Sequence, residues 1–286
     1  MVNYGAAFKL PFTSIGRSAA LFFLAAVATL ANASYSIISE LLKNDAGQYS
    51  VQAILLNLSV ALISFVVCLF FSIVISGYSI RIAASAVRGK NELPPFDNVP
   101  GLIGSGFKYT VALLVYTLPV LLFIVLIIAA VAADSPVLLI FAVIVGAILM
   151  ILWLIFLVYC SYMLQAHFAH EKRFGALFEL GKILKYSFTI AYFVPWLAGL
   201  GYSIGVGIPY ITIYFIIVVM TELLVISPFA MLFLVPFAAL YTVILTPTAA
   251  SLCGQAYGDI IGRKAAPVTA PPARVKPKSV NRGRKK

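Results

Sequence analysis

Charged and chemically reactive side chains are scarce in this sequence of 286 residues. Only 10% of the residues are charged, whereas a soluble domain carries about 25%. The three cysteines have no paired spacing, which argues against a disulfide framework and a zinc site. Apolar residues are abundant instead: they form 63% of the chain, and the mean hydropathy is +1.06. One core could not bury that much apolar surface, so we expect a bilayer to surround most of the protein.

The motifs of common enzyme classes are also missing. The sequence has no phosphate-binding glycine loop, no Gly-x-Ser-x-Gly turn and no plausible catalytic triad. His167 and His170 would share one helical face and could bind a metal, but no third ligand is evident. An interfacial position is the simpler interpretation of these histidines. We therefore predict that the protein is not an enzyme, with no catalytic residue, no cofactor and no metal.

Long apolar runs occupy most of the chain. A membrane-spanning helix needs about 20 such residues. The runs cover residues 18–42, 51–77, 107–132, 136–165 and 187–253, and the last holds either two spans or three. The predicted fold class is therefore all-α, a polytopic transmembrane helical bundle.

The basic residues decide between six spans and seven. With six spans, nineteen of the twenty Lys and Arg residues fall on one side, and only Lys43 falls on the other. The positive-inside rule places the basic side in the cytoplasm. We predict a six-span protein of the cell membrane with both termini cytoplasmic. Its parts are the N-terminus (1–17), the membrane domain (18–262) and a disordered basic tail (263–286).

The first span could instead be a signal peptide. Lys9 and Arg17 precede an apolar stretch that contains an Ala-x-Ala site at 31–33. The apolar pattern continues beyond that site through Leu41. We therefore expect an uncleaved first span.

A short internal repeat suggests how the spans are paired. GFKYTVALLVYTLP (106–119) resembles ILKYSFTIAYFVP (183–195). Farther along, the pairs Ser135-Pro136 and Ser227-Pro228 would each open a returning span, since proline suits the first turn of a helix. We therefore predict three helical hairpins, each opened by a cytoplasmic segment.

The fifth span is long and rich in helix-breaking residues. A break inside a membrane is tolerated only where protein or a water-filled cavity satisfies the backbone, and such breaks can mark a transport site. A kink or an elbow outside the membrane is the alternative. Glu222 is either the coupling carboxylate of such a site or a residue of the outer turn. The possible transport-site residues are Gly199, Gly201, Gly205, Gly207, Pro209 and Glu222.

Two basic segments between spans resemble amphipathic helices. In residues 78–90 and 172–186, apolar and polar side chains recur on opposite helical faces. We predict that both segments lie in the headgroup plane, and the alternative is that they extend the spans into the cytoplasm. The residues expected to contact anionic lipid are Arg81, Arg88, Lys90, Lys172, Arg173, Lys182, Arg263 and Lys264.

Three glycines follow the last span at intervals of four residues. Gly254, Gly258 and Gly262 would share one helical face, which permits close helix packing. The contact is either a seam between copies of the chain or packing against a neighbouring helix of the same chain.

The stretch GYSIRIAASAVRGKNELPPFDN (77–98) resembles a signature of the archaeal integral membrane proteins catalogued as domain of unknown function 4013. In that family a span ends in Gly-Tyr, and a basic residue, Arg-Gly and Leu-Pro-x-Phe-Asp follow. The matching residues are Gly77, Tyr78, Arg81, Arg88, Gly89, Leu93, Pro94, Phe96 and Asp97. The resemblance extends over roughly residues 10–260 and implies a multi-span architecture, with no activity to carry over.

These observations predict a membrane-organising or complex-stabilising bundle whose basic tail contacts anionic lipid. Its partners would be membrane lipids and an unknown membrane protein or a second copy of the chain. Contact of the tail with nucleic acid or the ribosome is a weaker hypothesis, because the tail lacks aromatic residues that stack on bases. The alternative function is a transporter or channel for a small or lipidic solute.

Overall fold

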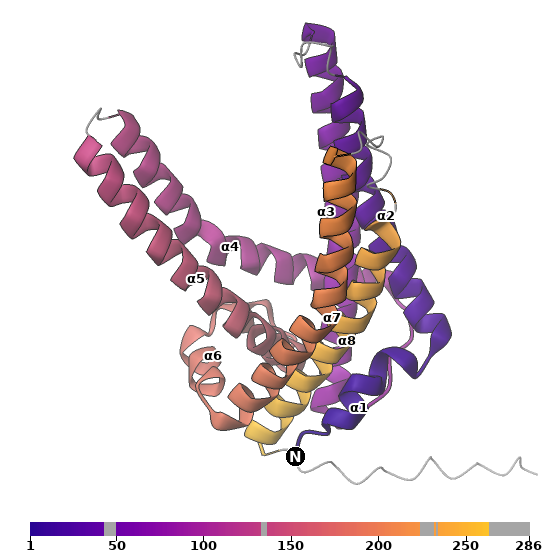
Figure 1. Ribbon diagram of the computed structural model, residues 1–286. Helices are drawn as coiled ribbons and strands as arrows, with labels where there is room; N and C mark the ends of the chain where they lie inside the picture. The colour runs from indigo at the N-terminus through magenta and orange to yellow at the C-terminus, as the bar shows by residue number, and fades with distance from the viewer. Residues whose placement is uncertain (43–49, 133–135, 224–231, 233, 263–286) are drawn as a thin grey trace, which may run out of the picture.

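The computed structural model describes residues 1–42, 50–132, 136–223, 232 and 234–262, and every regular element in them is a helix. Six helices are long and apolar enough to span a membrane: α2 (Ile15–Leu41), α3 (Val51–Val87), α4 (Val99–Ala132), α5 (Pro136–Glu171), α7 (Ile190–Leu223) and α8 (Leu234–Ile260). The short helices are α1 (Tyr4–Lys9), η1 (Leu10–Phe12), η2 (Phe174–Phe178) and α6 (Leu180–Ser187). The predicted all-α class and six candidate spans are confirmed (Figure 1).

Local sequence signals fix several helix starts. The Ser50 hydroxyl accepts a hydrogen bond from the Ala53 N–H at 3.1 Å and caps α3. Pro136 begins α5, as predicted. The second Ser-Pro pair, Ser227-Pro228, lies outside the described residues. Helices α2 and α3, α4 and α5, and α7 and α8 each pack together, but their pairing as repeated hairpins stays a prediction.

Helix α3 is too long to lie within a bilayer. Its 37 residues span about 55 Å, whereas the hydrocarbon is about 30 Å thick. The prediction of a separate surface helix within residues 78–90 is therefore wrong, because residues 78–87 continue α3. The second basic segment does form separate short helices, η2 and α6. Its position in the headgroup plane stays a prediction.

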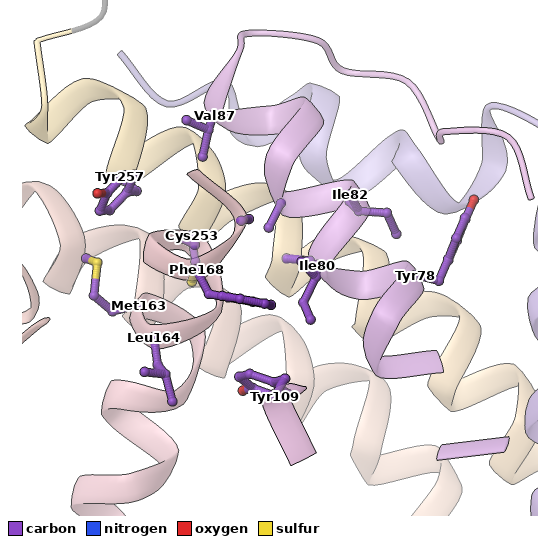
Figure 2. Packing of buried hydrophobic residues seen from close by; sticks show 14 of the residues in the cluster. Tyr78, Ile80, Ile82, Val87, Tyr109, Met163, Leu164, Phe168, Cys253 and Tyr257 are labelled. Atoms are coloured by element: carbon purple, nitrogen blue, oxygen red, sulfur yellow. The ribbon is translucent and has the colours of Figure 1, made fainter. Parts of the chain in front are cut away.

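The buried core lies at one end of the bundle. The end of α3, the start of α4 and the ends of α5 and α8 meet there, and we call it the basic end because it carries Arg88, Lys108 and Lys172. Tyr78, Ile82, Met163 and Tyr257 are each at most 1% exposed (Figure 2). Away from this end, α4 and α5 run side by side and lean away from α2, α3, α7 and α8 (Figure 1).

The glycine-rich span is not broken. Helix α7 runs continuously from Ile190 to Leu223 through Gly199, Gly201, Gly205 and Gly207, and it includes Pro195 and Pro209. The break considered as a transport site is therefore not seen, whereas the alternative of a kink within a continuous helix stays a prediction. Glycine and proline are tolerated in membrane helices because the freed backbone groups find partners in neighbouring helices and side chains. Glu222 falls in the last turn of α7, and its side chain lies outside what the structure describes.

Two glycines let α8 approach α3 closely. A methyl group on Gly254 would lie 2.7 Å from the Ala83 carbonyl oxygen, and one on Gly258 would lie 2.9 Å from that of Val87. Both glycines of α8 therefore pack within the chain. Gly262, just past the end of α8 with a φ of +70°, does not pack in this way against the part of the chain that the structure describes: apart from its chain neighbours, no atom there lies within 4 Å of the position that a Cβ would occupy. The alternative that Gly262 lies in a seam between copies of the chain stays a prediction.

Candidate anion-binding cleft

The loop after α3 folds back along that helix. Gly89 has a φ of +76°, a left-handed conformation that favours glycine. A glycine in this conformation just past the last turn is a common end of a helix, here α3. The Tyr78 hydroxyl donates to the Pro94 carbonyl oxygen at 2.8 Å, and its ring stacks on Phe96 with centroids 3.8 Å apart. Leu93 is 1% exposed, and its carbonyl accepts a hydrogen bond from the Arg17 guanidinium. The residues of the recognised signature thus hold one loop in place.

Arg81 binds the end of the same loop. Its guanidinium donates to the carbonyl oxygens of Pro95 at 2.9 Å and Asp97 at 2.7 Å, and it forms an ion pair with the Asp97 carboxylate. The Asp97 carboxylate compensates the charge of Arg81. Arg81 therefore positions the loop that leads into α4. Its predicted lipid contact stays a prediction.

This arrangement leaves an open cleft of about 590 Å³ at the basic end. One wall is the last part of α3, from Gly77 to Ser85, followed by Arg88. The start of α4 contributes Gly101, Gly104 and Lys108. The end of α5 contributes Phe168 and Ala169, followed by Lys172. The volume is within the usual range of small-molecule sites, about 300–1,000 Å³.

Three cations of the cleft are uncompensated. Arg88, Lys108 and Lys172 are exposed and form no ion pair with any other residue that the structure describes. Lys172 follows α5 with a left-handed φ of +57°, and its backbone N–H donates to the Phe168 carbonyl oxygen at 2.8 Å. Arg88 follows α3, Lys108 lies in α4 and Lys172 follows α5, so only the fold places all three around one cleft.

The cleft includes some of the predicted lipid contacts and omits others. Arg81, Arg88 and Lys172 line it, whereas Lys90 is exposed beyond the end of α3 and does not. Arg263 and Lys264 lie outside the described residues. Lys108 also lines the cleft and was not among the predicted residues, although its place at the start of a span, on the same side as Arg81, was a usable signal.

Arg173 and Lys182 join a second charged cluster outside the cleft. Arg173 lies 3.2 Å from carboxylate oxygens of both Glu171 and Glu179, and the Lys182 ammonium lies 2.9 Å from Glu179. The hydrogen bond from Lys182, followed by that from His167, lowers the pKa of Glu179 below its usual value. The same Glu179 hydrogen bond raises the pKa of Lys182. These cations are therefore paired with protein carboxylates.

The two histidines do not converge on one point. His167 is 1% exposed, with Nδ1 2.8 Å from the Tyr257 hydroxyl and Nε2 3.1 Å from a Glu179 oxygen. His170 Nδ1 instead lies 3.3 Å from Glu171. His167 is thus buried against Tyr257 near the end of α5, and the interfacial position of the two histidines stays a prediction. Within the described ranges, no group of three His, Cys, Asp or Glu residues is placed to hold a metal.

Six apolar helices and a cationic cleft at one end define a multi-span membrane protein with a candidate anion site. The family described as "Protein of unknown function (DUF4013)" matches residues 60–215, more than half of the chain, and the protein belongs to that family. The match includes the whole cleft, but it is narrower than the resemblance expected over residues 10–260 and does not reach α8. No curated protein and no solved structure matches the chain.

Proposed function

We propose that this protein is a non-enzymatic membrane-organising protein that binds anionic lipid headgroups in its cleft. In this proposal the basic end faces the cytoplasm, where the positive-inside rule places it and where anionic lipids concentrate. The observation that carries the proposal is that Arg88, Lys108 and Lys172, from three different candidate membrane helices or the residues that follow them, all line one open cleft.

The chemistry of the walls suits a lipid rather than a purely polar solute. Ile80, Ala84 and Phe168 give the cleft an apolar side, while its cations come from helix ends where headgroups lie. Basic pockets between membrane helices on the cytoplasmic side are a recognised form of headgroup site. Lipid bound there would bridge α3, α4 and α5 at the end where the core lies.

A charge-matched pair of variants tests the proposal. The cleft variant changes Arg88, Lys108 and Lys172 to Gln. The control changes Lys9, Lys90 and Lys185 to Gln; these residues are exposed and do not line the cleft. Both variants lose three positive charges, so diffuse attraction to an anionic surface falls similarly in both.

Each protein is reconstituted in neutral nanodiscs containing a small fraction of phosphatidylglycerol, and bound lipid is measured by native mass spectrometry. We expect the cleft variant to bind at least about tenfold more weakly than the wild type, since each cation near anionic lipid contributes on the order of 1 kcal/mol. The control should stay near the wild type. Equal loss in both variants would refute a specific headgroup site.

A further inference from the structure

We propose that the cleft selects a lipid headgroup that carries two phosphate groups. This inference rests on the proposed function and names the ligand class of the same site. A phosphodiester headgroup brings one negative charge, whereas a terminal phosphate monoester adds about −1.5 to −2 at neutral pH. The cleft presents three uncompensated cations, because the charge of Arg81 is matched by Asp97. One phosphodiester would leave most of that positive charge unmatched.

The positions of the cations favour two separate phosphates over one. Arg88 ends α3, Lys108 lies in α4 beyond Gly104, and Lys172 follows α5. These three residues stand on different walls of a space of about 590 Å³. A ligand with two phosphates joined by a short polyol reaches more than one wall. Charge-assisted hydrogen bonds to phosphate are the strong ones, so a second phosphate adds selectivity as well as charge.

Neutral donors complete the polar side of the cleft. Asn98 has a φ of +49°, and its side-chain oxygen accepts from the Gly101 N–H at 3.2 Å. That contact leaves its amide NH₂ as a donor on the cleft wall, together with the Ser85 hydroxyl. A polyol-linked bisphosphate offers acceptor oxygens to both groups.

Gly104 lines the cleft without adding a side chain to it. Apart from the backbone of its own helix, no atom of the described residues lies within 4 Å of the position that a Cβ would occupy there. A Gly104→Leu substitution would therefore place an apolar side chain at the cleft wall, starting from a Cβ position with open space around it. Gly205 on α7 has the same open surroundings and lies away from the cleft, so Gly205→Leu is a matched control.

The test compares two lipids that differ by a single phosphate. Wild-type protein in nanodiscs is given phosphatidylglycerol or phosphatidylglycerol phosphate at amounts that give equal total surface charge. A third arm offers inorganic pyrophosphate in solution. We expect the bisphosphate lipid to bind about tenfold more tightly than phosphatidylglycerol, because one more charged group is engaged. Gly104→Leu should abolish the difference, and Gly205→Leu should preserve it.

Each other outcome overturns a defined part of the inference. Equal binding of the two lipids, still weakened in the triple Gln cleft variant, refutes selection of two phosphates and leaves the proposed function intact. Binding of neither lipid in a cleft-dependent way refutes both. Pyrophosphate that binds as tightly as the bisphosphate lipid and displaces it identifies a soluble ligand and refutes the lipid assignment.

Discussion

The imidazole Nδ1 of His167 lies 2.8 Å from the hydroxyl oxygen of Tyr257. His167 belongs to α5 and Tyr257 to α8, and both are at most 1% exposed. The other ring nitrogen of His167 faces Glu179, between η2 and α6. One side chain therefore connects two membrane helices to the segment that follows α5.

Replacing His167 by alanine should destabilise the protein. It leaves the buried Tyr257 hydroxyl without its imidazole partner and creates a cavity, so we expect a loss of about 2 kcal/mol or more in the free energy of unfolding. Tyr257→Phe should cost about 1 kcal/mol, since the ring packing remains. Denaturation in detergent micelles measures both. Tyr214→Phe, on the exposed side of α7, is the control and should not differ from the wild type. A His167→Ala protein as stable as that control contradicts the prediction.

The charged cluster around Glu179 predicts a dependence of stability on pH. In the folded state, hydrogen bonds from Lys182 and His167 lower the pKa of the Glu179 carboxyl below its ordinary value of 4.5. The stabilisation from the ionised Glu179 is therefore fully present above about pH 4.5, and it is lost as the pH falls through the lower pKa of the folded state. Glu179→Gln should lower the melting temperature at neutral pH and flatten its decline in acid. Thermal scans across pH check this, with Glu92→Gln, an exposed loop residue, as the control. If the melting temperature of Glu179→Gln declined in acid as steeply as that of the wild type, other groups would control the acid dependence.

The crossing of α3 and α4 should be intolerant of added atoms. A methyl group on Gly106 would overlap the Ile73 carbonyl, and one on Gly77 would overlap that of Leu102. Because backbone atoms block the space, Gly106→Ala should destabilise the protein by about 1–3 kcal/mol or prevent folding. Gly205→Ala should be neutral, since nothing lies within 4 Å of its Cβ position. Folded yield and thermal stability in detergent compare the two. Similar values for both variants would mean that α3 and α4 do not cross so closely.

Lys172 offers a way to separate binding from folding. Its left-handed φ of +57° costs a non-glycine residue roughly 1 kcal/mol, which glycine avoids. Lys172→Gly should therefore keep or raise thermal stability while weakening phosphatidylglycerol binding about fivefold through loss of one cation. Lipid titration and melting on the same preparation measure both quantities. Loss of stability together with binding would assign Lys172 a role in folding instead.

The recognised signature was visible in the sequence, but its meaning was not. The amphipathic pattern of the stretch that contains Gly77, Tyr78, Arg81 and Phe96 predicts a surface helix that ends at two prolines. In the structure, the Tyr78–Phe96 stack and the Arg81 hydrogen bonds hold the loop against α3. Spacing alone could not reveal this, because the partners are backbone carbonyls whose positions depend on how the loop folds back.

The glycines also show which features the sequence could predict and which needed the structure. Those of α7 looked like breaks because glycine and proline weaken helices in water. In a bilayer the backbone has no water to bind, so the helix persists through Gly199 and Pro209. Conversely, nothing in the sequence indicated that Gly106 lies where α4 crosses α3 closely. Such close approach depends on which residue of the neighbouring helix lies opposite.

The sequence by itself determined the helical class, the six candidate spans and the gathering of basic residues at particular helix ends. These features follow from local hydropathy and from the length of each apolar run, because the thickness of the bilayer sets the length of a spanning helix. Only the tertiary structure decided which faces meet, that Arg88, Lys108 and Lys172 share one cleft, and that His167 reaches Tyr257. Lipid-facing and protein-facing side chains are equally apolar in such helices, so no periodic pattern distinguishes them before the helices pack.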